Sequence, residues 1–419
     1  MKRKGLLWSF LGLFLALSLV LSVGILLAGP SQAGANEVLS QAPALLDSGG
    51  GLNDAFLADA AEWIGDHFFL RQELISLGNA ISARLFHTSG NDAVILGSDG
   101  WLYYRSTLDD YTGQNAMTER ELFCAAYNLQ LMAQYCSSEG KAFVFVIAPN
   151  KNSVYGENMP DYGVVSQEHD AQKLLMLLAE AGVDTVDLFA AFSQQEEVLY
   201  YVTDSHWNAR GAALGADEIN RAFGIESDYF GGEFTASETG HTGDLYEMLY
   251  PAFSGTETEL QYAGTLDFTY ASSAVQPDSI TLLTTGKGEG TLLAYRDSFG
   301  NLLYPYLADS FASARFSRST SYDLTREADY VLVELVERNL DYLLRYVPVM
   351  PSPAEEVAVP AASGTAAATL QTGAAAPEGY ALWRGTLPVT PDTQTTVSLT
   401  AQGLAYAAFL TADNGLGGG

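Results

Sequence analysis

The stretch Phe143-Val-Phe-Val-Ile-Ala148 decides the fold of this chain. All six of its residues are apolar, and it ends at Pro149. A short, uninterrupted apolar run of this kind is typical of a strand that is buried on both faces of a sheet. Tyr330 to Leu335 (YVLVEL) forms a second run of the same type. Both runs therefore predict strands in the interior of a domain.

Helical and strand patterns alternate around these two runs. Ala171–Ala181 and Asn208–Phe223 have helical spacing, and Asn208 is a suitable N-cap for the second helix. Short strands are predicted at 185–189 and 292–295. Strands that alternate with helices at this spacing predict an α/β domain with a parallel sheet and helices on both faces.

The composition allows a large core and argues against nucleic-acid binding. The chain has 419 residues, of which 48% are hydrophobic, enough for about two folded units. Its 50 acidic and 20 basic residues give a net charge of -30. Such a field repels nucleic acids and anionic surfaces, so neither is an expected partner.

The N-terminus carries a targeting segment. Lys2, Arg3 and Lys4 precede an uncharged, mostly apolar stretch from Gly5 to Gly29. This stretch exceeds the usual signal-peptide core of ~7–15 residues and matches the ~20 residues that span a bilayer. Residues 1–30 are therefore expected to be a signal anchor with the remainder outside the cell membrane. Cleavage near 31–33 and secretion is the alternative.

Composition divides the rest of the chain. Residues 31–53 are small and polar and predict a spacer. The main domain is expected at 54–348, with an insertion of loops and β-hairpins at 229–285. A Pro- and Ala-rich linker is expected at 349–378. Residues 379–419 alternate weakly and predict a small β segment that must dock on the main domain to be stable.

The two cysteines do not form a disulfide in this interpretation. A capping box at Thr118 and Glu121 starts a predicted helix that contains both Cys124 and Cys136. Twelve residues of helix separate the thiols by ~18 Å, too far for a bridge. Both are expected to be buried thiols.

Two polar positions have the spacing of a catalytic pair. Asp204 and His206 are two residues apart, so in extended backbone both side chains leave the same face of the chain. A carboxylate there can hold the imidazole in one tautomer, and the imidazole can then activate a serine. Helix capping by Asp204 and burial of His206 in the core are the simpler alternatives.

The serine candidate is Ser298. It follows the predicted strand 292–295 and precedes a helix-like segment at Phe299. In that position its own N–H and the helix dipole can stabilise an oxyanion. Asp-Ser-Phe-Gly by itself is a weak motif, however, and many strand-to-helix turns contain one.

The Asp204-Ser205-His206-Trp207-Asn208 segment resembles the Asp-x-His-Trp block of the DHHW proteins and of the AlgX/AlgJ-type alginate O-acetyltransferases, whose domain is SGNH-hydrolase-like. Ser205 stands where many members have His, and we assign it no role. The resemblance covers roughly residues 55–345, and several ordered blocks are more specific than one. The other blocks are Trp63–Leu74, Gly97–Tyr104, Pro149-Asn150-Lys151 with Tyr155 and Pro160, Gly243-Asp244-Leu245, Arg296–Phe299 and Glu334–Asn339.

This resemblance implies a flavodoxin-like SGNH fold with Asp204, His206 and Ser298 as a catalytic triad. It also implies an O-acetyltransferase that acts on a cell-envelope glycan or exopolysaccharide, works with a membrane-bound O-acyltransferase and needs no cofactor. An O-acetyl esterase and a catalytically silent glycan-binding scaffold are the alternatives. Because of the net charge, we expect a neutral or mixed glycan rather than an anionic one.

Four further residues are candidates for oxyanion or substrate contacts. Asn150 and Lys151 follow a strand, where ligands gather in open α/β sheets. Asn150 would donate to an oxyanion or serve as a turn residue, and Lys151 would add positive charge to the cleft. Trp207 is expected to pack under the His206 loop, with a sugar platform as the alternative. Tyr304 would line the acceptor groove or pack within a helix.

Two expectations concern the remaining charged and metal-binding side chains. Arg338 is expected to pair with Glu334 or Glu337 as a structural ion pair. The histidines other than His206 have no metal-ligand spacing, so no zinc site is expected. These histidines are His67, His87, His169 and His241.

Overall fold

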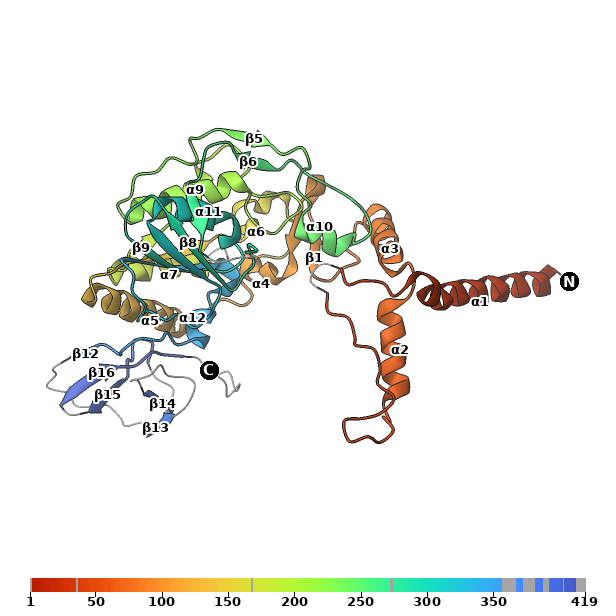
Figure 1. Cartoon of the computed structure of the whole chain (residues 1–419), viewed down its shortest axis with the longest axis horizontal. Coiled ribbons are helices and arrows are strands. Elements are labelled where there is room, and N and C mark those ends of the chain that lie inside the picture. The colour runs from red at the N-terminus through yellow and green to blue at the C-terminus, as the bar shows by residue number, and fades with distance from the viewer. Residues whose placement is uncertain are drawn as a thin grey trace.

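The computed structural model describes residues 2–34, 37–166, 169–271, 275–355, 367–371, 381–386, 392–401 and 403–411. Its centre is a seven-stranded sheet with strand order β4-β3-β11-β9-β10-β8-β7 (Figure 1). The strands are β3 (Ala142–Ala148), β4 (Thr185–Val186), β7 (Phe268–Tyr270), β8 (Thr281–Gly286), β9 (Thr291–Tyr295), β10 (Ser313–Ser317) and β11 (Tyr330–Val336).

The sheet is mixed rather than wholly parallel. The five strands from β4 to β10 run parallel, whereas β8 and β7 are antiparallel additions at one edge. The expected insertion at 229–285 thus contributes two strands to the main sheet. Only residues 287–290 separate β8 from β9, too few for the crossover that parallel strands require, so the direction reverses.

Strand β3 explains why its sequence is apolar at every position. Phe143, Phe145 and Ile147 point into one hydrophobic cluster, while Val144 and Val146 point into the other. The alternation follows from the two-residue period of a strand. The first cluster lies under α5 (Glu119–Ser138) and α7 (Asp170–Glu180), and the second under α8 (Leu188–Ser193), α9 (Ala209–Ala222) and α11 (Gly300–Ser310).

Several local predictions are confirmed. Thr118 and Glu121 form a capping box at the start of α5, which carries both buried, unpaired cysteines. The Asn208 side chain caps α9 by accepting from two backbone N–H groups. The strand expected at 185–189 is wrong beyond Val186, because Asp187 accepts from the Ala190 N–H and starts helix α8.

An N-terminal helix, α1 (Lys2–Ala28), leads into the molecule. Among the described residues it is the one helix long and apolar enough to cross a bilayer, over Trp8–Ala28 with a mean hydropathy of 2.7. It fits a signal anchor. Helices α2 (Phe56–His67) and α3 (Arg71–Phe86) follow, beside the exit of α1 (Figure 1).

Shorter elements connect these parts. They are β1 (Val94–Leu96), β2 (Leu102–Tyr104), α4 (Leu108–Thr112), α6 (Lys151–Val154), β5 (Phe234–Ala236), α10 (Asp244–Leu249), β6 (Leu260–Tyr262) and α12 (Tyr342–Arg345). Strands β1 and β2 form a hairpin, and β5 pairs antiparallel with β6 across a segment that contains α10.

Short strands also follow the main domain. They are β12 (Ala354–Glu355), β13 (Ala367–Gln371), β14 (Leu382–Thr386), β15 (Ser398–Ala401) and β16 (Leu404–Ala407). Asn128 on α5 holds this segment through two hydrogen bonds with the backbone of Leu410, at 2.9 and 2.8 Å. The described parts of the expected linker contain β12 and β13, whereas 356–366 and 372–378 lie outside the described residues.

Candidate active site

Asp204, His206 and Ser298, here called the triad, form a continuous hydrogen-bonded chain. Ser298 lies just after β9, and its Oγ is 2.9 Å from Nε2 of His206. Nδ1 of the same imidazole is 2.8 Å from Oδ1 of Asp204. This is the geometry in which a histidine can take the proton of a serine hydroxyl while a carboxylate fixes its tautomer.

Asp204 accepts hydrogen bonds from four directions. Besides Nδ1 of His206, its carboxylate accepts from the His206 N–H at 2.9 Å, Nε2 of His241 at 2.9 Å and the Asp244 N–H at 3.0 Å. Burial raises the pKa of this carboxyl, but the bonds from His206 and His241 outweigh it and hold the pKa well below its usual range. Asp204 is therefore a carboxylate at neutral pH.

The charges around His206 act in opposite directions. Burial lowers the pKa of the imidazole, but hydrogen bonding and attraction from Asp204 outweigh burial, so the net pKa is raised. Asp244 adds to this rise, and Arg338 opposes it. The basicity of His206 therefore depends on two residues outside the triad.

Ser205, to which the sequence assigned no role, connects the triad to α10. Its N–H and Oγ donate to the two carboxylate oxygens of Asp244 at 2.7 and 2.6 Å. This places Oδ2 of Asp244 3.6 Å from Nδ1 of His206. Donor atoms of Asp204, His206 and Asp244 lie within 4.8 Å of one another, close enough to hold a metal ion. All three side chains already take part in hydrogen bonds of this network.

Asp297 fixes the turn that carries Ser298. Its carboxylate accepts from the N–H of Val336, the last residue of the neighbouring β11, at 2.7 Å and from Nδ2 of Asn339, three residues beyond that strand, at 3.2 Å. It also accepts from the Phe299 N–H at 2.9 Å. No described residue accepts from the Ser298 N–H, so this donor is free to face a reacting carbonyl oxygen.

Trp207 supports the triad from below. The side chain is fully buried, and its Nε1 donates to the Phe299 carbonyl at 3.1 Å. Its ring packs against that of Phe299, on which the His206 ring also rests at 4.8 Å. The packing role is confirmed, and the alternative of a sugar platform is wrong, because a buried indole has no face to offer a ligand.

Lys151 does not line a cleft but anchors backbone. Its Nζ donates to the carbonyls of Leu102, Val202 and Asp204 at 2.7, 2.7 and 2.9 Å, and the side chain is buried. Burial lowers its pKa to about 7. Three carbonyl acceptors favour the ammonium form, because a neutral amine has only two N–H groups to donate. The expected contribution to a positive cleft is therefore wrong.

Asn150 and Tyr304 are engaged elsewhere in the domain. Nδ2 of Asn150 donates to Asp110 at 3.1 Å, and its backbone N–H donates to Glu337 at 2.9 Å. Tyr304 is buried in the core, where its hydroxyl bonds that of Tyr270 at 2.7 Å. An oxyanion role for Asn150 stays a prediction, while Tyr304 packs within the fold.

Arg338 differs from its predicted role. It forms no ion pair with a described residue, and its guanidinium lies 5.6 Å from the ring centroids of Phe299 and Tyr104. Glu337 bonds the Asn150 N–H and the Ser153 hydroxyl instead. The cation is thus held by aromatic faces and remains available to a ligand.

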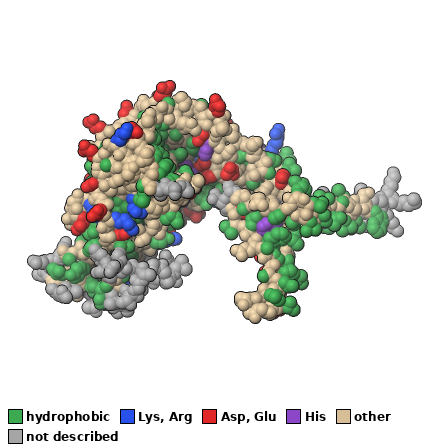
Figure 2. Space-filling view, viewed as in Figure 1, with side chains coloured by type: hydrophobic (Ala, Val, Ile, Leu, Met, Phe, Trp, Pro, Cys, Tyr) green, Lys and Arg blue, Asp and Glu red, His purple; other side chains and the backbone are tan. Residues whose placement is uncertain are grey.

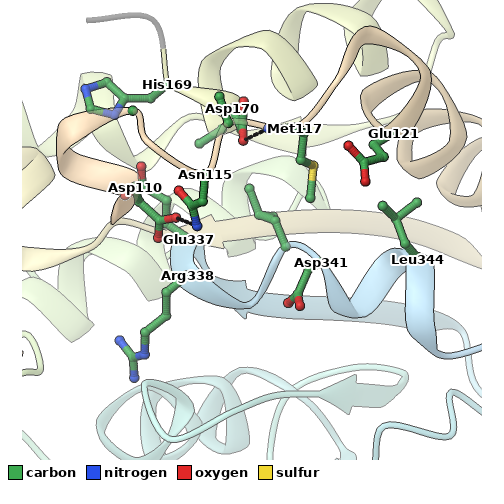
Figure 3. Close-up of a pocket in the computed structure, with 14 residues that line it drawn as sticks. Asp110, Asn115, Met117, Glu121, His169, Asp170, Glu337, Arg338, Asp341 and Leu344 are labelled. Atoms are coloured by element: carbon green, nitrogen blue, oxygen red, sulfur yellow. Dashed lines mark hydrogen bonds between the residues drawn. The ribbon is translucent and has the colours of Figure 1, made fainter. Parts of the chain in front are cut away.

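A cavity lies next to Arg338, at the carboxyl ends of β3 and β11. Its volume is about 290 Å³, and its wall is mainly acidic and polar. Figure 3 shows the Arg338 side chain directed away from Asp170 and Met117, which also line the cavity. The labelled lining residues are Asp110, Asn115, Met117, Glu121, His169, Asp170, Glu337, Arg338, Asp341 and Leu344.

Comparison with known proteins identifies the domain. Residues 94–293 match the family model of the SGNH hydrolase-like domain of the acetyltransferase AlgX. The match shows what these residues are similar to, and it covers a little under half of the chain. The expected family resemblance and fold class are confirmed. The match includes Asp204 and His206 and ends five residues before Ser298, since 298 − 293 = 5.

A sequence relative of this chain is a probable alginate O-acetylase AlgJ from Pseudomonas syringae pv. tomato. The two are 27% identical over 176 residues, which are 41% of this chain and 43% of the relative. The chain thus spans less than half of the length of the curated relative that it matches.

Solved structures with a similar chain trace have lower identities. The O-acetyltransferase domain of Pseudomonas putida AlgJ has 18% identity and a TM-score of 0.40, covering 59% of this chain and 92% of that chain. PatB1 of Bacillus cereus has 20% identity and a TM-score of 0.47, covering 60% of this chain and 97% of that chain. A DHHW family protein of Eubacterium siraeum has 16% identity and a TM-score of 0.42, covering 54% of this chain and 90% of that chain.

Sequence reasoning missed two residues that the structure places on the triad. His241 has no metal-ligand spacing and is given no role by the sequence, yet it donates to Asp204. Asp244 enters the sequence analysis only as part of the Gly243-Asp244-Leu245 block. The available signal for Asp244 was a polar Gly-Asp turn within a loop-rich insertion. Such a turn does not identify the residues that it contacts in the folded domain.

Proposed function

We propose that this chain is an extracytoplasmic O-acetyltransferase that acts on a cell-envelope or exopolysaccharide glycan. Ser298 is the nucleophile, His206 the general base and acid, and Asp204 the carboxylate that orients the imidazole. The observation that carries the proposal is the pair of contacts of His206, 2.9 Å to Ser298 and 2.8 Å to Asp204. The length and apolar character of helix α1 support a single anchor with the domain outside the membrane.

The reaction has two balanced steps. Ser298 Oγ attacks the acyl carbonyl while Nε2 of His206 takes its proton, and His206 then protonates the leaving group, which gives an acyl-serine. A glycan hydroxyl next attacks this ester as His206 takes the hydroxyl proton. Collapse of the intermediate returns that proton to Ser298. The free N–H of Ser298 donates to the oxyanion in both steps.

The acyl donor and the acceptor are two different molecules in this proposal. The acetyl group is supplied by a membrane-bound O-acyltransferase, and the acceptor is a hydroxyl of the glycan. Arg338 has no ionic partner among the described residues, so its guanidinium can bind a ligand. We assign this residue to oxygen atoms of the acceptor or of the donor.

The first test is a comparison of esterase rates with p-nitrophenyl acetate, using the full chain in detergent. Ser298→Ala should lower the rate by a factor of about 10³ or more. Ser193→Ala is the matched control, because Ser193 is an exposed serine on α8 away from the triad. Equal rates for Ser298→Ala and wild type would exclude the serine mechanism.

The second test separates transfer from hydrolysis. Neutral wall oligosaccharides are added with the same donor, and the products are analysed by mass spectrometry. Acetylated oligosaccharide that is absent with Ser298→Ala supports transfer. Release of acetate alone, with every tested acceptor, would assign the chain to the O-acetyl esterases instead.

A further inference from the structure

Helix α3 packs on the domain through polar residues and leaves apolar residues on its outer face. Its small polar residues face inward, where Ser76 Oγ accepts from the Ala252 N–H at 2.9 Å and Nδ2 of Asn79 donates to the Leu249 carbonyl at 2.7 Å. Four of its large apolar residues recur at helical spacing and are exposed, and so is Leu70, which lies just before its first residue. The exposed positions are Leu70, Leu74, Leu77, Ile81 and Leu85. These five are called the leucine stripe below.

The leucine stripe leaves a large apolar surface exposed along one helix. Leu77 exposes 50% of its surface and Leu85 exposes 67%, and both lie on the same face. Helix α2 is also exposed, since none of its residues is buried and Leu57 is 80% exposed. Contiguous exposed apolar surface of this kind marks contact with an apolar partner or a membrane.

Contacts with α1 indicate what lies against this apolar surface. The loop before α3 lies against the apolar span, where the Phe69 N–H donates to the Leu21 carbonyl at 3.2 Å. The Phe69 side chain packs on Gly24 so closely that no Cβ would fit there. Leu21 lies seven residues before Ala28, the end of the span, which is roughly 10 Å along a helix. The Phe69 loop therefore lies beside the apolar span of α1 and not beyond its end.

The direction of the helices agrees with this placement. Helices α2 and α3 run across the direction of α1 rather than along it (Figure 1). Figure 2 shows hydrophobic side chains continuing from α1 onto these two helices. If α1 crosses the bilayer, α2 and α3 lie in the plane of its outer surface, the position of an interfacial amphipathic helix.

We propose that α2, the Phe69 loop and the leucine stripe of α3 form a platform that is inserted into the outer lipid surface beside the anchor. The proposal rests on the membrane placement given under the proposed function. Its occupant is the lipid itself, at the boundary between headgroups and acyl chains. The net charge of -30 means that apolar burial and not attraction to anionic lipid stabilises it.

The platform is directly linked to the triad. Asn79 and Ser76 hold the end of α10 and the residues after it, and α10 begins at Asp244. The N–H of Asp244 donates to Asp204. A lipid-bound α3 therefore fixes the height and orientation of the active site above the membrane.

The test uses the full chain in vesicles of pure phosphatidylcholine. An environment-sensitive fluorophore is attached to Leu77→Cys or Ile81→Cys, and doxyl-labelled lipid is the quencher. Both native cysteines are buried, so unmodified protein reports background labelling. Met176→Cys, at an exposed apolar position on α7, is the matched control, and Leu15→Cys reports insertion of α1.

We expect lipid quenching at Leu77 and Ile81 to exceed that at Met176 by about twofold or more, at every protein-to-lipid ratio. Quenching at Leu15 without quenching at Leu77 and Ile81 would overturn the platform alone. Shielding at Leu77 that grows with the protein-to-lipid ratio and is insensitive to the quencher would show that a second copy covers the stripe, and would also overturn it. No quenching at Leu15 would remove the membrane placement together with the platform.

Discussion

Arg338 and His206 pack against the same aromatic ring, that of Phe299, the residue that follows the candidate nucleophile. The guanidinium carbon lies 5.6 Å from the ring centroid, and the imidazole centroid lies 4.8 Å from it. A fixed positive charge therefore lies beside the imidazole. It opposes the rise that Asp204 and Asp244 cause in the pKa of His206.

The first prediction concerns this charge. Arg338 lowers the pKa of His206, so Arg338→Met should raise it. Because His206 must be neutral to accept the Ser298 proton, the acid limb of the kcat/KM profile should move to higher pH, by up to about one unit. The measurement is the pH profile of p-nitrophenyl acetate hydrolysis, with Arg338→Lys as the control that keeps the charge. An unchanged acid limb would show that the cation does not act on His206.

The second prediction has the opposite sign. Asp244 raises the pKa of His206, so Asp244→Asn should lower it and move the acid limb to lower pH. Asn keeps a side-chain oxygen that can accept from Ser205, which limits damage to the turn. The same pH profile is the readout, and circular dichroism checks that the fold is intact. A shift in the same direction as that of Arg338→Met would contradict the electrostatic account.

The third prediction concerns Lys151. Lys151→Met leaves three buried carbonyls without a donor, so unfolding free energy should fall by about 2–3 kcal/mol at pH 7. The pKa of Lys151 is about 7 in the fold, against an ordinary 10.5. Between those values the unfolded state binds more protons, so wild-type stability should rise with pH relative to Lys151→Met. Urea unfolding at several pH values measures both effects.

A pH-independent difference between wild type and Lys151→Met would argue that Lys151 stays charged throughout. In that case its three acceptors would outweigh burial. The loss of stability at pH 7 is expected under either protonation state, so it serves as the internal check that the substitution reached the buried site.

The fourth prediction concerns docking of the C-terminal strands. Asn128→Ala removes both hydrogen bonds to the Leu410 backbone and a third to the Leu343 carbonyl. The C-terminal segment should become more sensitive to protease while the main domain keeps its activity. Limited proteolysis with mass spectrometry locates the cleavage. Gln130→Ala, on the same helix, is the control, and equal cleavage of both variants would show that Asn128 is not the anchor.

The sequence predicted the parts of the fold that depend on local pattern. β3 was predictable because each of its faces meets a separate core, and α9 because Asn208 caps it. The reversal of β8 and β7 was not, since weakly alternating edge strands resemble loops. The pairing of Asp204 with His206 was predictable from their two-residue spacing, although the backbone is bent there rather than extended and the carboxylate also accepts from the His206 N–H. His241 reaches them only after the insertion has folded back across 35 residues, since 241 − 206 = 35, and no short-range pattern records that.

The four donors that surround Asp204 have one more consequence. Two of them, Nε2 of His241 and the N–H of Asp244, belong to a segment that must close over the Asp204 turn late in the chain. Before it closes, the carboxylate has lost half of its partners and the imidazole is held less firmly. The orientation of the imidazole therefore depends on tertiary contacts made by the insertion, and the hydrogen-bonded chain to Ser298 is complete only in the folded domain.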